Sequence, residues 1–292
     1  MVAFMMQSSL CRFFLLGLFF SLSNLTPAQD YIWPTDASRG LTSTFAESRP
    51  GRFHAGIDIK TWGREGYKVF AIRPGHISRI RVSPYGYGKA LYLTLDTGEI
   101  VVYGHLKAFN DEIEQYVWQQ QQKEGKYAVQ LWPSADRFVV EQGDLIGYSG
   151  QTGIGYPHLH FEVRDRGNKP FNPLLLGYKV KDTISPIIRR ISVTPLDAYS
   201  HVENDWRPLV EETVYIRPGE YQIADTIDVN GRFAFGVSAY DQMDGIHNKF
   251  SAYKIAFFID DKEIFRSRYD TFSYSINGMA KLDRDYRLAS LG

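Results

Sequence analysis

The stretch Pro157-His158-Leu159-His160-Phe161-Glu162-Val163-Arg164 decides how the rest of the chain is interpreted. In an extended strand, residues two apart project from the same face, so His158 and His160 would lie side by side. Taken alone, such a pair is more often two ordinary strand histidines than two ligands of one metal. Its meaning therefore depends on which residues the rest of the chain can bring beside it.

A further histidine is paired with a carboxylate in Arg52-Phe53-His54-Ala55-Gly56-Ile57-Asp58. Four extended residues span roughly 13 Å, which is too far for His54 and Asp58 to hold one metal. A helix would bring them together, but Gly56 followed by β-branched Ile57 disfavours a helix, whereas glycine permits a bend. Two imidazoles and one carboxylate that leave a position open are typical of a catalytic zinc site, because structural sites close with four protein ligands.

Short runs of β-type residues, separated by glycines, lie between these two motifs. Residues 89–96 alternate leucines with Tyr92 and Thr94, the two-residue period of a half-buried strand. The segment Val102-Tyr103-Gly104-His105-Leu106 ends another such run on a histidine. We predict further strands of this kind at residues 69–72, 77–82, 100–103 and 161–163.

The order and local context of these motifs resemble a known family, the zinc metallopeptidases of the lysostaphin and LytM type, which cut peptidoglycan cross-bridges. The resemblance extends from about Trp33 to Pro173. One departure is Ala46, in Thr44-Phe45-Ala46, where the family often has glycine, and we expect it to change only a turn. Besides the stretch 157–164, the motifs that carry the resemblance are His54-x-Gly56-x-Asp58, Gly66-x-x-Val69-x-Ala71-x-x-x-Gly75, Tyr85-Gly86-Tyr87-Gly88, Tyr103-Gly104-His105-Leu106, Gly143-Asp144-Leu145-Ile146-Gly147 and Gly150-Gln151-Thr152-Gly153.

The resemblance implies roles for five residues. His54, Asp58 and His160 would hold Zn²⁺, and His105 and His158 would be the catalytic pair beside the water that zinc activates. One histidine of the pair would accept the proton of that water, and the other would stabilise the oxyanion and help to protonate the leaving amine. The sequence does not assign these two tasks. Some relatives have lost such groups and act only as regulators, but all five are present here, so the resemblance implies activity.

Glu162 has two interpretations. It shares the parity of His158 and His160, so in a strand it would lie on their face and could orient a metal ligand. A salt bridge on the strand face explains its presence equally well. The family pattern does not make Glu162 a zinc ligand, and the predicted site therefore omits it.

The stretch from residue 107 to 141 is long for the core of this fold. Asn110-Asp111-Glu112 can cap a helix, with acids where the helix dipole favours them, and apolar residues from Ile113 onward follow at helical spacing. Gly125 would end this helix. We predict a helical insertion over about residues 110–125 and interpret the stretch as a lid, a wall of the substrate groove or a partner-docking element.

From about Lys179 the sequence changes character. Residues 182–186 read as a linker, and repeated short strands without a clear helix then indicate an immunoglobulin-like β-sandwich. This half shows no defensible cluster of metal-binding or nucleophilic residues. Gly292 follows no obvious closing strand, so the domain reads as incomplete. The predicted strands are residues 187–193, 233–239 and 253–259, with a hairpin turn at 260–262.

The first residues have the order of a secretory signal. Arg12 precedes an apolar run at 13–20, and Ala28 offers a small residue for cleavage before Gln29. A membrane anchor is the alternative, but the run is short of the ~20 residues that span a bilayer. The only cysteine, Cys11, precedes the run, whereas a lipoprotein cysteine would follow it. We expect export to the periplasm or cell envelope.

Composition and length support a folded protein of about two domains. The 292 residues are 44% hydrophobic, which excludes a disordered chain, and 33 basic residues balance 33 acidic ones, which argues against a sequence-blind nucleic-acid binder. No apolar run after the N-terminus could span a membrane. We predict a mainly β protein: a signal peptide at 1–28, a LytM-type antiparallel β-sheet peptidase domain with an open groove at 29–178, and a β-sandwich at 179–292.

Three functions are compatible with these observations. The first is an exported zinc-dependent endopeptidase that hydrolyses the peptide cross-links of peptidoglycan. The second is a non-catalytic wall-binding or amidase-activating module on the same fold, against which the intact ligand set argues. The third is an exported zinc hydrolase with another peptide substrate. A regulatory protein partner is a further option, and the sequence does not decide which cross-link is cut or what the C-terminal half does.

Overall fold

The computed structural model describes residues 31–282, 285 and 288, which belong to one compact unit that begins at Tyr31. The predicted signal peptide, residues 1–28, lies outside the described residues. Within the described part, no helix is both long enough and apolar enough to cross a membrane.

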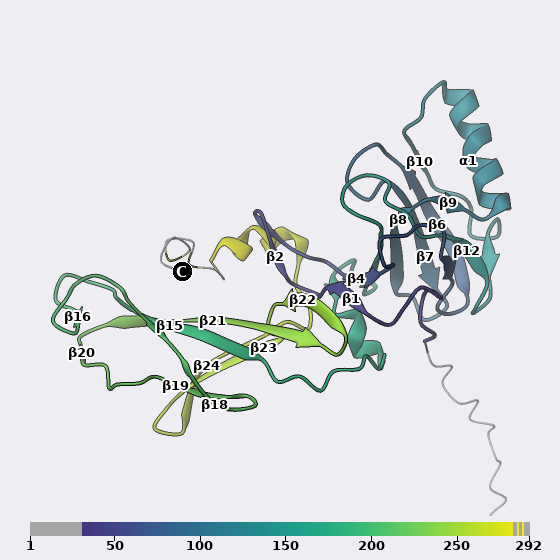
Figure 1. Ribbon diagram of the computed structural model, residues 1–292. Helices are drawn as coiled ribbons and strands as arrows, with labels where there is room; N and C mark the ends of the chain where they lie inside the picture. The colour runs from purple at the N-terminus through teal and green to yellow at the C-terminus, as the bar shows by residue number, and fades with distance from the viewer. Residues whose placement is uncertain (1–30, 283–284, 286–287, 289–292) are drawn as a thin grey trace, which may run out of the picture. The chain divides into compact units, whose positions relative to one another are not determined.

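The first part of the chain folds around a nine-stranded sheet in which all neighbours are antiparallel (Figure 1). This arrangement confirms the predicted antiparallel β fold. The strands along the sheet are, in spatial order, β1 (Leu41–Ser43), β4 (Ile57–Lys60), β13 (His158–Arg164), β8 (Ile100–Leu106), β7 (Lys89–Leu95), β6 (Gly75–Val82) and β10 (Val129–Leu131), with β11 (Val139–Val140) paired to β6 and β14 (Pro170–Phe171) paired to β13.

Smaller elements surround this sheet. Each strand predicted for this part is present, with boundaries shifted by at most three residues. The additional elements are a second sheet of β5 (Lys68–Phe70), β12 (Leu145–Tyr148) and β9 (Ala108–Phe109), a hairpin of β2 (Ser48–Arg49) and β3 (Arg52–Phe53), and the 3-10 helix η1 (Pro173–Leu176).

The two faces of strand β13 have different roles: one packs in the hydrophobic core, and the other carries His160. Leu159, Phe161 and Val163 are fully buried in the hydrophobic core, and the ring of Phe161 lies 5.7 Å from that of Tyr103 on β8. Full burial of such a side chain stabilises a fold by about 1.5–3 kcal/mol. The alternate residues, which include His160, are thereby held on the opposite face.

The predicted helical insertion is present as α1 (Asp111–Glu124), which Figure 1 shows beside β9 and β10. The side chain of Asn110 accepts a hydrogen bond from the Ile113 amide and caps the N-terminus. Gly125 ends the helix in the left-handed conformation, with φ 64°. Ile113 and Val117 are buried, so the apolar side of the helix packs onto the core.

The C-terminal part is antiparallel β, as predicted. Its hairpin turns at Asp260 and Asp261, which both have positive φ, as a tight two-residue turn requires. The elements are a sheet of β17 (Leu209–Glu212), β15 (Ile187–Pro195), β21 (Phe233–Met243) and β22 (Ile246–Phe250), the hairpin of β23 (Lys254–Ile259) and β24 (Lys262–Arg268), two small pairs, β16 (His201–Val202) with β20 (Val229–Asn230) and β18 (Val214–Arg217) with β19 (Glu220–Gln222), and the 3-10 helix η2 (Tyr274–Lys281).

The C-terminal sheet and hairpin face each other across an open groove of about 1280 Å³. The rings of Phe235 on β21 and Phe257 on β23 lie 4.6 Å apart, yet Phe235 and Phe265 remain about half exposed. The two layers of the predicted sandwich therefore meet at this groove rather than in a closed core.

Strand β22 belongs to the main core as well as to the C-terminal sheet. Met243, Ile246 and Phe250 are buried in the same hydrophobic cluster as Leu41. The Leu41 amide donates a hydrogen bond to the sulfur of Met243 at 3.4 Å. Figure 1 shows β22 beside β1.

Candidate metal centre

Two adjacent strands place the first two candidate ligands opposite each other. In the sheet register, His160 on β13 faces Asp58 on β4 and, on its other side, Gly104 on β8. A Cβ atom at Gly104 would lie 3.2 Å from the Cβ atom of His160. Glycine at this position therefore leaves room for the imidazole.

The third candidate ligand, His54, reaches the cluster through the predicted bend. A Cβ atom at Gly56 would lie 2.4 Å from the carbonyl oxygen of Phe161, so only glycine lets the chain pass this close to β13. The bend turns His54 back over Asp58. His54 and Asp58 are therefore close enough to hold one metal, which they would not be in an extended strand.

The turn at Ala46 holds the backbone of His54. Ala46 has φ 60°, in the left-handed region that glycine adopts most easily, which agrees with the glycine common in the family. Its amide donates to the His54 carbonyl at 2.8 Å, and the His54 amide donates to the Glu47 carbonyl at 2.8 Å.

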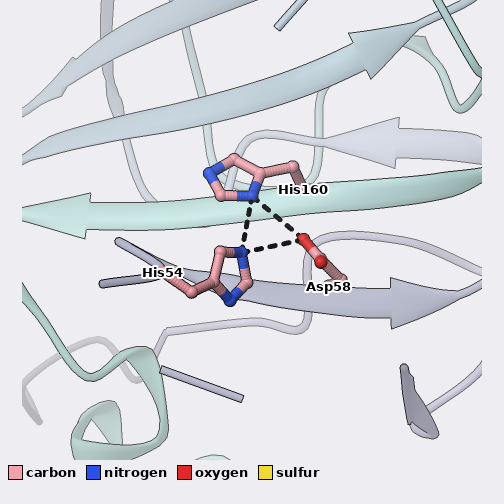
Figure 2. Close-up of side chains that lie close together, drawn as sticks. All are labelled: His54, Asp58 and His160. Atoms are coloured by element: carbon pink, nitrogen blue, oxygen red, sulfur yellow. Dashed lines mark hydrogen bonds and ion pairs between the residues drawn. The ribbon is translucent and has the colours of Figure 1, made fainter. Parts of the chain in front are cut away.

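Figure 2 shows the three side chains converging on one point. His54 Nε2 lies 3.1 Å from Asp58 Oδ1 and 3.1 Å from His160 Nδ1. His160 Nδ1 lies 3.0 Å from Asp58 Oδ1. All three residues are buried, with 3–8% of their surface exposed.

Each of these residues has another polar atom held outside the cluster. His54 Nδ1 donates to the Thr44 carbonyl at 2.8 Å, and His160 Nε2 donates to Glu162 Oε2 at 3.4 Å. Asp58 Oδ2 accepts from Arg49 Nη2 at 3.2 Å. The atoms left facing inward are two imidazole nitrogens and one carboxylate oxygen, a donor set that fits zinc, and ligating histidines in zinc proteins are anchored in this way.

Charge favours the ionised carboxylate in the cluster. Burial raises the pKa of Asp58, but the charge of His54 and hydrogen bonds from His160 and His54 outweigh burial and hold the pKa well below its usual range. Burial lowers the pKa of His160, but hydrogen bonds to Asp58 and Glu162 outweigh it and raise the pKa to about 9. A zinc ion would take the place of the proton on His160 Nδ1, because metal ligands bind deprotonated.

His105 reaches the same face through a β-bulge. Between β7 and β8, Lys89 pairs with Leu106 and Leu91 with Tyr103, so β8 contains one extra residue. Tyr103 and Leu106 both point into the core, and His105, with φ 60°, turns outward. Bulges re-aim side chains in this way, and they are frequent beside active sites.

His105 and His158 lie beside the cluster as a pair. Their ring centroids are 4.5 Å apart, and His158 Nε2 lies 3.5 Å from Asp58 Oδ1. His105 Nδ1 donates to the Thr152 carbonyl at 2.9 Å, and His158 Nδ1 donates to the Tyr156 carbonyl at 2.6 Å. Each ring therefore keeps its Nε2 atom as a proton acceptor.

Both rings of the pair are neutral at physiological pH. Burial is the main cause that lowers the pKa of His105 to about 4, and the charge of His160 acts in the same direction. Burial is also the main cause that lowers the pKa of His158. The structure thus brings together all five residues of the predicted site.

Glu162 makes the contacts that each of its two interpretations requires. Glu162 is fully buried, bonds to His160 and forms an ion pair with Arg164 Nε at 2.7 Å. It also accepts a hydrogen bond from the Tyr87 hydroxyl at 2.9 Å, while the Tyr87 ring stacks on His160 with centroids 4.8 Å apart.

Several residues that contact the site were not identified from the sequence. Tyr87 lies in the Tyr85-Gly86-Tyr87-Gly88 motif and Thr152 in the Gly150–Gly153 motif, so their motifs were the available signal. Arg49 and Tyr274, which donates to Glu162, had no signal that distinguished them from other surface residues.

The chain is similar in sequence to curated proteins over about half of its length. No family model matches the chain. The chain is 29% identical over 149 residues to the murein hydrolase activator NlpD of Escherichia coli K12, covering 51% of this chain and 31% of that protein. It is 29% identical over 154 residues to NlpD of Salmonella typhimurium, covering 53% and 33%. The chain thus spans about a third of the length of these curated relatives.

Similar solved structures include two peptidases. A zinc-containing peptidase from Vibrio cholerae is 28% identical, with a TM-score of 0.35 and coverage of 48% of this chain and 37% of that chain. The catalytic domain of lysostaphin from Staphylococcus simulans is 24% identical, with a TM-score of 0.34 and coverage of 48% and 92%.

The fold and the site define a mainly antiparallel β protein with a buried His-Asp-His cluster that could hold a metal. Together with the order of the motifs and the sequence similarity to the murein hydrolase activators, they confirm the predicted resemblance. The chain is therefore similar to proteins of the lysostaphin and LytM type.

Proposed function

We propose that the chain is an exported zinc-dependent endopeptidase that hydrolyses the peptide cross-links of peptidoglycan. The observation that carries the proposal is the convergence of His54 Nε2, Asp58 Oδ1 and His160 Nδ1 within 3.0–3.1 Å of one another, beside two neutral histidines. A metal site built only to stabilise the fold would need neither a coordination position left free for water nor the neighbouring pair of His105 and His158.

The residues divide the chemistry between them. His54, Asp58 and His160 would hold zinc, which when bound supplies Lewis acidity to the attacking water and to the scissile carbonyl. His105 and His158 each present an Nε2 atom that can accept a proton from the attacking water. A ring that has accepted a proton becomes a donor, either to the oxyanion or to the leaving amine.

Two further observations support the proposed substrate and location of the protein. The curated relatives are named murein hydrolase activators, and murein is peptidoglycan. The N-terminal sequence has the order of a secretory signal, which would direct the mature chain from Gln29 to the periplasm or cell envelope. These observations support a cell-wall substrate over another exported peptide.

A second candidate function is favoured by the same names. Because the curated relatives are activators, the chain could bind the wall or a wall amidase without cutting anything itself. The presence of all five residues of the site supports catalysis over this alternative. A regulatory protein partner is compatible with either function.

The deciding experiment is digestion of purified peptidoglycan by the mature protein, with and without a chelator, followed by mass analysis of the released fragments. We expect cleavage within peptide cross-links, abolished by the chelator and restored by zinc. The fragments would also identify the bond. If a zinc-loaded protein releases no fragments but stimulates an added wall amidase, the activator function replaces the endopeptidase.

A further inference from the structure

The 3-10 helix η2, near the C-terminus, contacts two segments that carry candidate metal ligands. The hydroxyl of Tyr274 donates a hydrogen bond to Glu162 Oε1 on β13, two residues after His160. Asn277 Oδ1 accepts a hydrogen bond at 2.6 Å from the amide of Phe53, the residue before His54. These two hydrogen bonds connect η2 to residues that lie 112 and 224 positions earlier in the sequence, beside the metal centre.

Glu162 is the point through which Tyr274 reaches the candidate ligand. Its Oε2 atom accepts from the Tyr87 hydroxyl and from His160 Nε2, and its Oε1 atom accepts from Arg164 Nε and from Tyr274. A carboxylate offers about four acceptor positions, so these four donors saturate it. Since Glu162 is fully buried, a lost donor could not readily be replaced by bulk water.

We propose that Tyr274 is a positioning residue of the metal centre: it fixes Glu162, which holds His160 by its Nε2 atom, so the C-terminal segment sets the affinity for zinc. This inference rests on the zinc site of the proposed function but not on peptidase activity. It assigns to the C-terminal part a role in building the metal centre.

The hydroxyl of Tyr274 is separable from the packing of its segment. Phe272 anchors the segment, with its ring 5.2 Å from that of Phe45 and 5.5 Å from that of Phe53. The Tyr274 ring lies 5.1 Å from the Arg164 guanidinium and is 37% exposed. Replacing the hydroxyl by hydrogen keeps these ring contacts and removes only the donor to Glu162.

The test compares zinc affinity in the full chain, by competition with a chromophoric chelator, for the unmodified protein, Tyr274→Phe and Tyr253→Phe. The control is matched, because the Tyr253 hydroxyl also donates to a carboxylate, that of Asp270. Among the described residues, Asp270 forms its ion pair with Arg268 and not with a candidate ligand. Loss of a residue that orients a ligand typically weakens metal binding 10–100-fold, and Tyr274 acts one bond further out, so we expect about 3–10-fold for Tyr274→Phe. For Tyr253→Phe we expect a change within about twofold.

A double-mutant cycle tests the route through Glu162. We expect Glu162→Gln alone to weaken zinc binding by about tenfold or more. If Tyr274 acts through Glu162, Tyr274→Phe adds little in the Glu162→Gln background. Independent, additive losses would overturn the route. Far-UV circular dichroism of each variant shows that the fold is retained, and a purely structural role for the hydroxyl would not produce this coupling.

The outcomes separate the inference from the proposed function. An unmodified protein that binds zinc with the same affinity as Tyr274→Phe overturns the inference alone. An unmodified protein that binds no zinc contradicts the zinc site and the inference with it. Zinc binding that depends on Tyr274, without digestion of peptidoglycan, supports the inference and contradicts only the endopeptidase function.

Discussion

Each candidate zinc ligand presents one atom to the cluster because another of its atoms is engaged elsewhere. The Thr44 carbonyl holds the far nitrogen of His54, and Glu162 holds that of His160. An imidazole anchored in this way has a defined tautomer and ring orientation, so binding a metal costs little further ordering. The same logic applies to His105, whose Nδ1 atom is held by the Thr152 carbonyl, although its task differs.

The difference between holding the metal and moving protons can be tested at single residues. We expect His160→Ala to lose zinc and activity together, because it removes an inward-facing nitrogen. We expect His105→Ala to keep its zinc and to lose turnover by about 10²–10⁴-fold, the usual contribution of a general acid or base. Metal analysis of the purified variants and digestion of peptidoglycan measure the two effects. Full activity of the His105 variant would rule out its catalytic assignment.

At the scale of elements, the loop that supports His105 depends on close backbone approach. Gly88 has φ 61°, and a Cβ atom there would lie 2.3 Å from the backbone of Thr152, the residue that orients His105. Gly86 has a similar φ of 65°, but the nearest atom to its Cβ would be 4.0 Å away. Substituting Gly86 therefore tests the backbone conformation alone, whereas substituting Gly88 tests the conformation and the steric contact together.

Alanine at each position should have a different cost. We expect Gly86→Ala to lower the free energy of unfolding by about 1–2 kcal/mol, the cost of the left-handed conformation. Gly88→Ala should lower it by about 1–3 kcal/mol more, because Thr152 must move, and it should also reduce turnover by misplacing His105. Urea denaturation and digestion assays measure the two quantities. Equal effects of both substitutions would show that the contact with Thr152 is unimportant.

A half-buried ion pair connects the end of β7 to the loop after β5. Arg73 Nε and Nη2 donate to Asp96 Oδ1 and Oδ2, each at 2.9 Å. The hydrogen bonds from Arg73 lower the pKa of Asp96. A carboxylate with a depressed folded-state pKa stabilises the fold above its unfolded pKa of about 3.9, and this stability is lost as the pH falls through the folded value.

We therefore expect the effect of Asp96→Asn to depend on pH. Because the Asp96 side chain is 43% exposed and solvent screens the pair, the substitution should lower the free energy of unfolding by only about 0.5–1 kcal/mol at neutral pH. The difference should shrink below about pH 4 and should also be smaller at high salt. Chemical denaturation at several pH values checks this. A difference that persists unchanged in acid would show that the charge of Asp96 is not its cause.

Sequence patterns anticipated the elements whose cause is local. The alternation around Leu159, Phe161 and Val163 placed His158 and His160 on one face, and Asn110 and Gly125 marked the ends of α1. A bend at Gly56 was expected because an extended segment would hold His54 and Asp58 too far apart for one metal, and the two residues are indeed in contact. All five residues of the candidate site came from these patterns and from the family resemblance.

The unanticipated features depend on pairing between distant segments. The bulge that turns His105 outward exists only in the register of β8 against β7. The hydroxyl of Tyr274 meets a carboxylate 112 residues earlier in the chain, which no periodicity reports. The open groove between the C-terminal sheet and hairpin likewise depends on how two layers pack, whereas the strands themselves follow from composition.

At the scale of the whole molecule, the N-terminal sheet and strand β22 of the C-terminal sheet contribute to one hydrophobic core. Ile246 on β22 is 6% exposed and packs in the cluster that contains Leu41 on β1 and Ile59 on β4, the strand that carries Asp58. A Cβ atom at Gly40 would lie 2.8 Å from Ile246 Cδ1, so this contact is tight. Truncating Ile246 should therefore weaken the metal centre as well as the C-terminal sheet.

We expect Ile246→Ala to lower the free energy of unfolding by about 2–5 kcal/mol, the usual cost of removing a buried isoleucine side chain. Ile264→Ala on β24 is the matched control, because Ile264 is 53% exposed and should change stability by no more than about 0.5 kcal/mol. Urea unfolding is followed by far-UV circular dichroism and by zinc release, which reports on the metal centre. A shared core requires that Ile246→Ala shift both signals to lower urea by the same amount. If zinc release kept its midpoint while part of the dichroism signal moved, the two parts would unfold independently, and the contact at Ile246 would be a docking contact between separate cores.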